Sequence, residues 1–189
     1  MISDWKSSRL PVKHLGNWDE AARCFQNALT IAQKQESKRS IASSNGLLGD
    51  IERNRGNWDA AETLYQQALE LMTELGDRSG MANSWGVLGD IERNRGNWDA
   101  AQTLYRQSLT LRTELGDRSG MAESYSGLGK NECDRGNLEA VEQFSKQALV
   151  MAQELGITHL VAVGGNLKSC ALPNTSGRGE SRIFARGLM

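Results

Sequence analysis

The chain has little of the chemistry on which most enzymes and metal sites depend. It holds two histidines, His14 and His159, and three cysteines, Cys24, Cys133 and Cys170. No CxxC or Cys/His spacing joins them, so neither a zinc site nor a disulfide framework is indicated, and a histidine-based catalytic triad has no material. We therefore expect no enzyme activity, no cofactor and no metal. A reducing compartment is the simpler expectation.

Long apolar runs and an excess of one charge are also missing. The formal net charge is −1, which gives no general reason to expect nucleic acid or an anionic membrane as a partner. No stretch approaches the roughly 20 apolar residues of a membrane span, and the N-terminal MISDWKSSRL lacks the apolar core of a signal peptide. These absences predict a soluble, cytoplasmic protein.

Two short stretches resemble ligand loops but lack residues that those loops need. Asp50, Glu52, Asn54 and Gly56 recur at alternate positions like calcium ligands, yet Arg55 stands where an EF-hand loop requires glycine. The stretch GLGKN at 127–131 resembles a phosphate loop only faintly, because its first glycine and its final Ser or Thr are replaced. Neither stretch predicts a ligand.

Proline is nearly absent, and the long interval without proline contains a repeat. Pro11 and Pro173 are the only two prolines, so the interval between them is free to be helical. Within it the sequence repeats every 40 residues, in frames that open at Gly16, Gly56, Gly96 and Gly136, and 27 of 40 residues are identical between 56–95 and 96–135. Such self-similarity indicates a stacked array whose units bury their apolar faces against their neighbours.

Each unit carries the pattern of two helices. In the second frame, apolar residues at steps of three and four line one face of a helix: Trp58, Ala61, Tyr65, Ala68, Met72 and Leu75. Gly76 is predicted to end that helix and Asp77 to cap the next. The second pattern comprises Met81, Trp85, Leu88 and Ile91 and stops at Gly96, after which Asn97 offers another N-cap. The unit is therefore two antiparallel helices joined by very short turns.

These residues resemble the tetratricopeptide repeat (TPR), whose signature combines W-x2-L-G-x2-Y with a later G-x-Y and A-x3-F. The first part is matched by Trp85, Leu88, Gly89, Tyr125, Leu128 and Gly129. The second is matched by Gly16, Trp18, Ala21, Phe25, Ala28, Gly56, Trp58, Ala61, Tyr65, Ala68, Gly96, Trp98, Ala101 and Tyr105. The resemblance implies an all-α fold, a right-handed α-solenoid of antiparallel helix pairs. The 40-residue period is similar to the long-helix variants found in kinesin light chains and bacterial sensor proteins.

Several positions allow more than one interpretation. Glu52, Glu92 and Glu132 replace an aromatic of the family, and either pair with the arginine three residues later or form a functional ladder of charge. The recurring tryptophans Trp18, Trp58 and Trp98 are interpreted as core residues rather than as a binding platform. Cys24 aligns with Leu64 and is interpreted as a small core residue.

The ends of the array are predicted to be degenerate. Residues 1–15 are expected to be a broken first helix or disordered, because Pro11 falls inside the expected helix and the first full helix opens at Asn17. The repeat array is assigned to 16–168. Residues 169–189 are predicted to be a disordered tail. Poorly capped ends would favour self-association as a homo-oligomer.

The family resemblance places a groove on the first helix of each pair, which in this chain is the helix that holds residues 43–54, 83–94 or 123–134. Carried onto this chain, the groove positions are Ser43, Gly46, Asp50, Arg53 and Asn54, then Asn83, Gly86, Asp90, Arg93 and Asn94, and then Glu123, Ser126, Lys130, Cys133 and Asp134. Polar side chains there can bind the backbone and acidic groups of a protein or peptide. The resemblance implies a noncatalytic protein-binding scaffold. The alternatives are a sensor segment of a larger signalling protein and a self-associating structural module.

Overall fold

Seven α-helices make up the part of the chain that the structure, a computed structural model, describes, which is residues 12–154. The helices are α1 (Val12–Lys34), α2 (Lys38–Asn54), α3 (Trp58–Glu74), α4 (Arg78–Asn94), α5 (Trp98–Glu114), α6 (Arg118–Asp134) and α7 (Leu138–Glu154). Turns of three residues connect them. Among residues 12–154, no helix combines the length and the apolar character that crossing a membrane requires.

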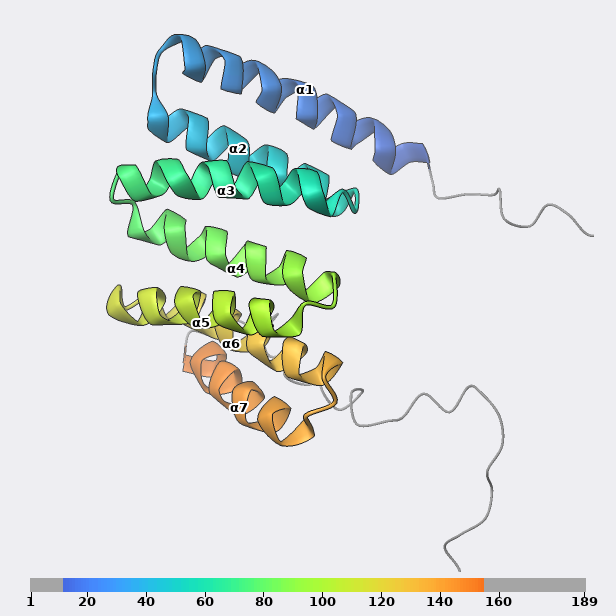
Figure 1. Ribbon diagram of the computed structural model, residues 1–189, viewed down its shortest axis with the longest axis vertical. Coiled ribbons are helices and arrows are strands. Elements are labelled where there is room, and N and C mark those ends of the chain that lie inside the picture. The colour runs from blue at the N-terminus through green and yellow to red at the C-terminus, as the bar shows by residue number, and fades with distance from the viewer. Residues whose placement is uncertain (1–11, 155–189) are drawn as a thin grey trace, which may run out of the picture.

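The helices form one continuous stack. Each helix contacts the next along the chain, and α4 also contacts α6. Figure 1 shows the stack running from α1 at one end to α7 at the other. The closest associations join α2 with α3, α4 with α5, and α6 with α7. This arrangement confirms the predicted all-α solenoid of helix pairs.

Glycines in the left-handed conformation end the helices. Gly56, Gly76 and Gly96 have φ angles of 79°, 65° and 82°, which glycine adopts without the steric penalty that a Cβ would bring. After Gly76, the carboxylate of Asp77 accepts a hydrogen bond from the backbone N–H of Gly80 at 3.0 Å. The predicted helix end at Gly76 and the predicted cap at Asp77 are therefore confirmed.

The corresponding cap at Asn97 is different. Asn97 occupies the N-cap position of α5 but forms no side-chain cap. Its Nδ2 instead donates to Oε2 of Glu92 at 2.8 Å, and Asn57 donates in the same way to Glu52 at 2.6 Å. Asn97 therefore stands at the predicted N-cap position, but its side chain does not cap the helix and is bonded to the carboxylate of Glu92 near the end of the preceding helix.

Small residues and tyrosines form the buried core. One cluster contains Ala61, Tyr65, Leu88 and Ile91, and the next repeats it one unit later with Ala101, Tyr105 and Leu128. The alanines are fully buried, which lets helix axes approach closely. Each cluster lies between two closely packed helix pairs, the first between α3 and α4 and the second between α5 and α6, so no single pair could bury it alone.

Two core assignments from the sequence are wrong. Trp18 and Trp98 are 37% and 40% exposed, so neither is a core residue; Trp58 is partly buried against the core. Cys24 is exposed. It lies on α1, which contacts α2 and has no described helix on its other side.

The predicted boundaries are only partly within the described residues. Helix α1 begins at Val12, five residues before Asn17, and runs through Gly16 without a turn. The first frame therefore opens inside a helix rather than at a glycine stop. The predictions for residues 1–11 and for the tail 169–189 lie outside the described residues. The end of the array at 168 lies outside them too, so self-association through the ends stays a prediction.

One turn lacks its glycine, and this predicts a stabilising substitution. Glu36 has φ of 53° at the position that Gly76 and Gly116 occupy in later units. We expect Glu36→Gly to raise the free energy of unfolding by about 1 kcal/mol, because it removes the strain of a Cβ in the left-handed region. Thermal or urea unfolding measures the change. Gly76→Glu is the reverse control, and a gain in stability there would contradict the explanation.

Candidate functional site

A continuous groove lies along α2, α4 and α6, with side chains of α3 and α5 at its floor. It consists of two hollows of about 700 and 380 Å³. Both are lined by Asp50, Asn83 and Val87, so one opens into the other. We call this surface the inner groove.

The inner groove contains most, but not all, of the predicted site residues. Those that line it are Ser43, Asp50, Arg53, Asn83, Asp90, Glu123 and Lys130, together with Gly46, Gly86 and Ser126. Those that are not among its lining residues are Asn54, Arg93, Asn94, Cys133 and Asp134. The structure therefore brings together the central positions of the three inner helices and leaves out those nearest the C-terminal ends of α2, α4 and α6.

Two arginines join neighbouring inner helices. Arg53 lies 2.9 Å from Asp50 on its own helix and 3.6 Å from Asp90 on α4. Arg93 lies 3.0 Å from Asp134 on α6. Each arginine thus bridges one unit to the next, and its side chain is less than a third exposed.

Tyrosines support the acidic residues of the groove from below. Tyr105 donates its hydroxyl to Oδ1 of Asp90 at 2.7 Å. Burial and the nearby charge of Asp90 raise the pKa of Tyr105, and burial together with a hydrogen bond to Asp50 raises the pKa of Tyr65. Both hydroxyls therefore stay protonated and act as donors that fix the aspartates in place.

The smaller hollow is largely apolar. Ala42, Leu47, Met72 and Val87 contribute to its lining, beside Tyr65. Leu47 is 43% exposed there. The inner groove therefore changes along its length, from an apolar end between α2 and α4 to a polar end between α4 and α6.

Arg112 is a groove residue that the sequence reasoning missed. It lines the larger hollow and belongs to α5, the second helix of its pair, where core residues were expected. A signal was present, because Arg112 aligns with Met72 in the apolar stripe of the preceding unit. Apolar packing alone does not explain a charged residue at a core position, so such a residue indicates a functional or strained place.

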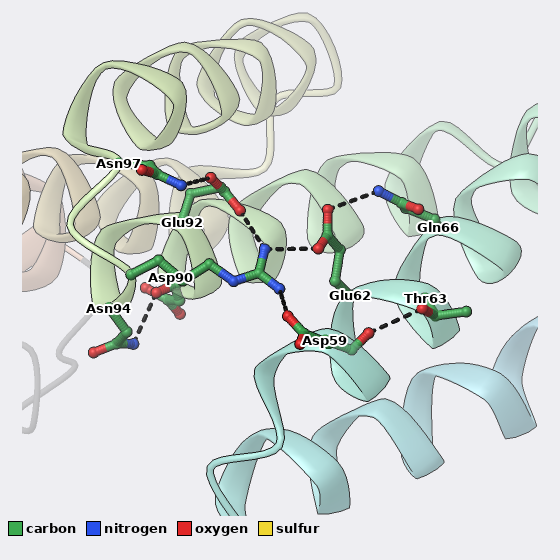
Figure 2. Close-up of polar contacts among 9 residues, drawn as sticks. Asp59, Glu62, Thr63, Gln66, Asp90, Glu92, Asn94 and Asn97 are labelled. Carbon is green, nitrogen blue, oxygen red and sulfur yellow. Dashed lines mark hydrogen bonds and ion pairs between the residues drawn. The ribbon is translucent and has the colours of Figure 1, made fainter.

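The glutamates at the family's aromatic position have mainly structural partners. Glu52 pairs with Arg55 at 2.8 Å and Glu92 with Arg95 at 2.7 Å, which favours the ion-pair interpretation for two of the three. Glu132 differs, since it accepts from Gln102 at 3.0 Å. Figure 2 shows the carboxylates of Asp59, Glu62 and Glu92, all three of which pair with the guanidinium of Arg95.

The described residues offer no material for a metal centre. Within residues 12–154, no group of three or more His, Cys, Asp or Glu side chains is placed to hold a metal ion. What the groove offers is hydrogen bonding, charge and apolar surface.

Paired helices, a core shared between units and a groove on the inner helices define a helical-repeat solenoid. The chain belongs to the tetratricopeptide repeat family, whose sequence model matches residues 13–74, 40–112 and 80–154. These matches together span the described part of the chain apart from its first residue. The family suggested by the sequence is thereby confirmed.

Comparison with solved structures agrees. A total of 67 chains match, among them the crystal structure of BtubC (BKLC) from P. vanneervenii, with a TM-score of 0.68 and 16% identity over 93% of this chain and 83% of that one. At this identity the likeness supports the fold alone. A comparison with curated proteins gave no match.

Proposed function

We propose that the protein is a noncatalytic scaffold that binds a peptide or protein segment in the inner groove. Tetratricopeptide repeats generally mediate protein interactions. The groove has the composition that such binding needs, with apolar surface at one end and fixed polar groups at the other.

The observation that carries the proposal is a set of unused polar atoms on the inner helices and beneath them. Nε of Arg53, Arg93 and Arg112 and Oγ of Ser126 are buried, and none has a hydrogen-bond partner in the described residues. A buried polar group without a partner costs about 1–3 kcal/mol. Arg53, Arg112 and Ser126 line the hollow of about 700 Å³ and Arg93 does not, so carbonyl or carboxylate oxygens of a bound segment would satisfy the donors of these three residues.

The test is a peptide-array screen of the protein and of an Arg53→Ala, Arg93→Ala double variant. We expect peptides that bind the wild type to bind the double variant at least about tenfold more weakly, since hydrogen bonds to charged groups contribute about 1.5–3 kcal/mol each. Circular dichroism and thermal unfolding show whether the variant keeps its fold.

A matched control removes the same charge elsewhere. Arg23 and Arg106 are exposed and lie on α1 and α5, away from the inner groove. The Arg23→Ala, Arg106→Ala variant should bind the same peptides as the wild type. If both double variants bind equally well, the segment does not occupy the inner groove.

A further inference from the structure

Two facing positions of the repeat change together in one unit. Where the second unit has Met72 and Asn83, the third has Arg112 and Glu123. Arg112 lies on α5 and Glu123 on α6, and both line the larger hollow of the inner groove. The third unit therefore differs from the second by a charge in the core register and an opposite charge at the rim.

Arg112 is held rigidly beneath the groove. Its side chain is 6% exposed. Nη1 donates to the carbonyl of Gly120 at 2.5 Å and to Oγ of Ser124 at 3.1 Å, and Nη2 donates to Oδ1 of Asn83 at 2.8 Å. These neutral acceptors fix the plane of the guanidinium without neutralising its charge.

The carboxylate that pairs with Arg112 is far more exposed than the arginine. Oε2 of Glu123 lies 3.1 Å from Nη2 of Arg112, yet the Glu123 side chain is 57% exposed. The other acid nearby, Asp117, lies 4.0 Å from Nε and is already the cap of α6 through its bond to Gly120 N at 2.9 Å. A buried, fixed arginine is thus neutralised chiefly by an exposed carboxylate at the rim, and such half-exposed pairs are weak.

The same hollow holds further unused groups. Nε of Arg112 and Oγ of Ser126 are buried without a hydrogen-bond partner, and Ser126 is 7% exposed. Lys130 lines the hollow, and no ion pair of the described residues involves it. A group that replaced Glu123 could therefore gain contacts that Glu123 does not make.

We propose that Arg112 binds a carboxylate of the partner segment and that Glu123 is an internal ligand, which occupies this place until the partner displaces it. The inference rests on the proposed function and adds to it the chemistry of one subsite. Because the stand-in is itself a carboxylate on a short side chain, the partner group is an Asp or Glu side chain. Displacement exchanges one ion pair for another, so affinity is gained only through the unused donors and Lys130.

The test uses the full chain and three capped synthetic peptides, Ala-Ala-Asp-Ala-Ala, its Asn counterpart and its phosphoserine counterpart, titrated by NMR. We expect the Asp peptide to shift the Nε–H resonance of Arg112 and to bind more tightly than the Asn peptide. In Glu123→Gln, the Asp peptide should bind about fivefold more tightly, because the competing charge is gone, while the Asn peptide is unchanged.

The matched variant is Arg112→Met, which restores the residue that Met72 provides one unit earlier. It should bind the Asp and Asn peptides equally, with its helical circular dichroism intact. If it does not fold, the Glu123→Gln comparison decides alone. Equal binding of both peptides to the wild type, or equal tightening of both by Glu123→Gln, overturns the inference, as does a stronger preference for the phosphoserine peptide. If none of the three peptides binds any variant, this subsite is refuted, whereas the array screen separately decides whether the groove binds segments at all.

Discussion

Gly89→Ala is expected to lower the free energy of unfolding by about 2 kcal/mol, within the usual range for overpacking a core. A Cβ at Gly89 would lie 2.9 Å from both Cδ1 and Cε1 of Tyr105. The ring cannot easily move away, because Tyr105 is 2% exposed and its hydroxyl is bonded to Asp90. Urea unfolding monitored by circular dichroism measures the loss.

Gly129 provides the matched control. It occupies the same position one unit later, but Ser145 replaces the tyrosine there, and the nearest atoms to an added Cβ are 3.7 Å away. We expect Gly129→Ala to be neutral or to stabilise by up to about 1 kcal/mol, the helix propensity of alanine over glycine. If both alanines cost the same, the cause lies in the helix and not in the tyrosine contact.

The clash at Gly89 also connects packing to the site. Tyr105 packs on Gly89 and lines the inner groove, and its hydroxyl orients Asp90. Displacing the ring would therefore move a groove carboxylate without any change to a groove residue. The contact between Tyr105 and Gly89 therefore explains why the repeat has glycine at this position, and it also holds the tyrosine that forms the floor of the groove.

Helices and turns could be predicted because the repeat displays the same constraints several times. Gly76 and Asp77 stop one helix and cap the next through their own backbone conformation and side chain, which needs no distant partner. The exposure of Trp18 and Cys24 could not be seen in the same way. Burial depends on which helix covers a residue, and the periodic pattern does not show where the coverage ends.

The site was predictable only as a set of positions. Asp50 and Arg53 line the inner groove, and the family resemblance pointed to them because it assigns one face of α2 to the groove. Asp134 was assigned by the same rule and instead holds Arg93. Arg112 was missed because it reaches the groove from the outer helix of its pair, and only its contacts with Asn83 and Ser124 reveal that direction.

Arg95→Ala is expected to lower the free energy of unfolding by about 2 kcal/mol, because it removes a guanidinium that three carboxylates share. Nη1 of Arg95 lies 2.6 Å from Glu62 and 2.7 Å from Glu92, and Nη2 binds Asp59. The hydrogen bond that Arg95 donates to Glu62 is the main cause that raises the pKa of Arg95, so the guanidinium stays charged at any pH that the fold tolerates. Without the guanidinium, the carboxylates of Glu62 and Glu92 repel each other, because both are less than a third exposed. Figure 2 shows how they lie.

The repeat supplies a graded series that tests this explanation. Arg55 has two carboxylate partners, Asp19 and Glu52. Arg135 has one, Asp99, whose side chain is 89% exposed. We expect Arg55→Ala to cost about 1 kcal/mol and Arg135→Ala about 0.5 kcal/mol or less, because exposed pairs contribute little.

The order of these losses decides between charge and packing. All three arginines occupy the same position of the helix, so loss of the aliphatic stem alone would make the three alanine variants equally unstable. If the carboxylates matter, the losses follow the number of partners, and 1 M NaCl reduces the penalty of Arg95→Ala by screening the repulsion that remains. Unfolding midpoints in urea at low and high salt measure both effects. Equal losses that salt does not change would mean that the arginine stabilises the stack through its hydrocarbon chain.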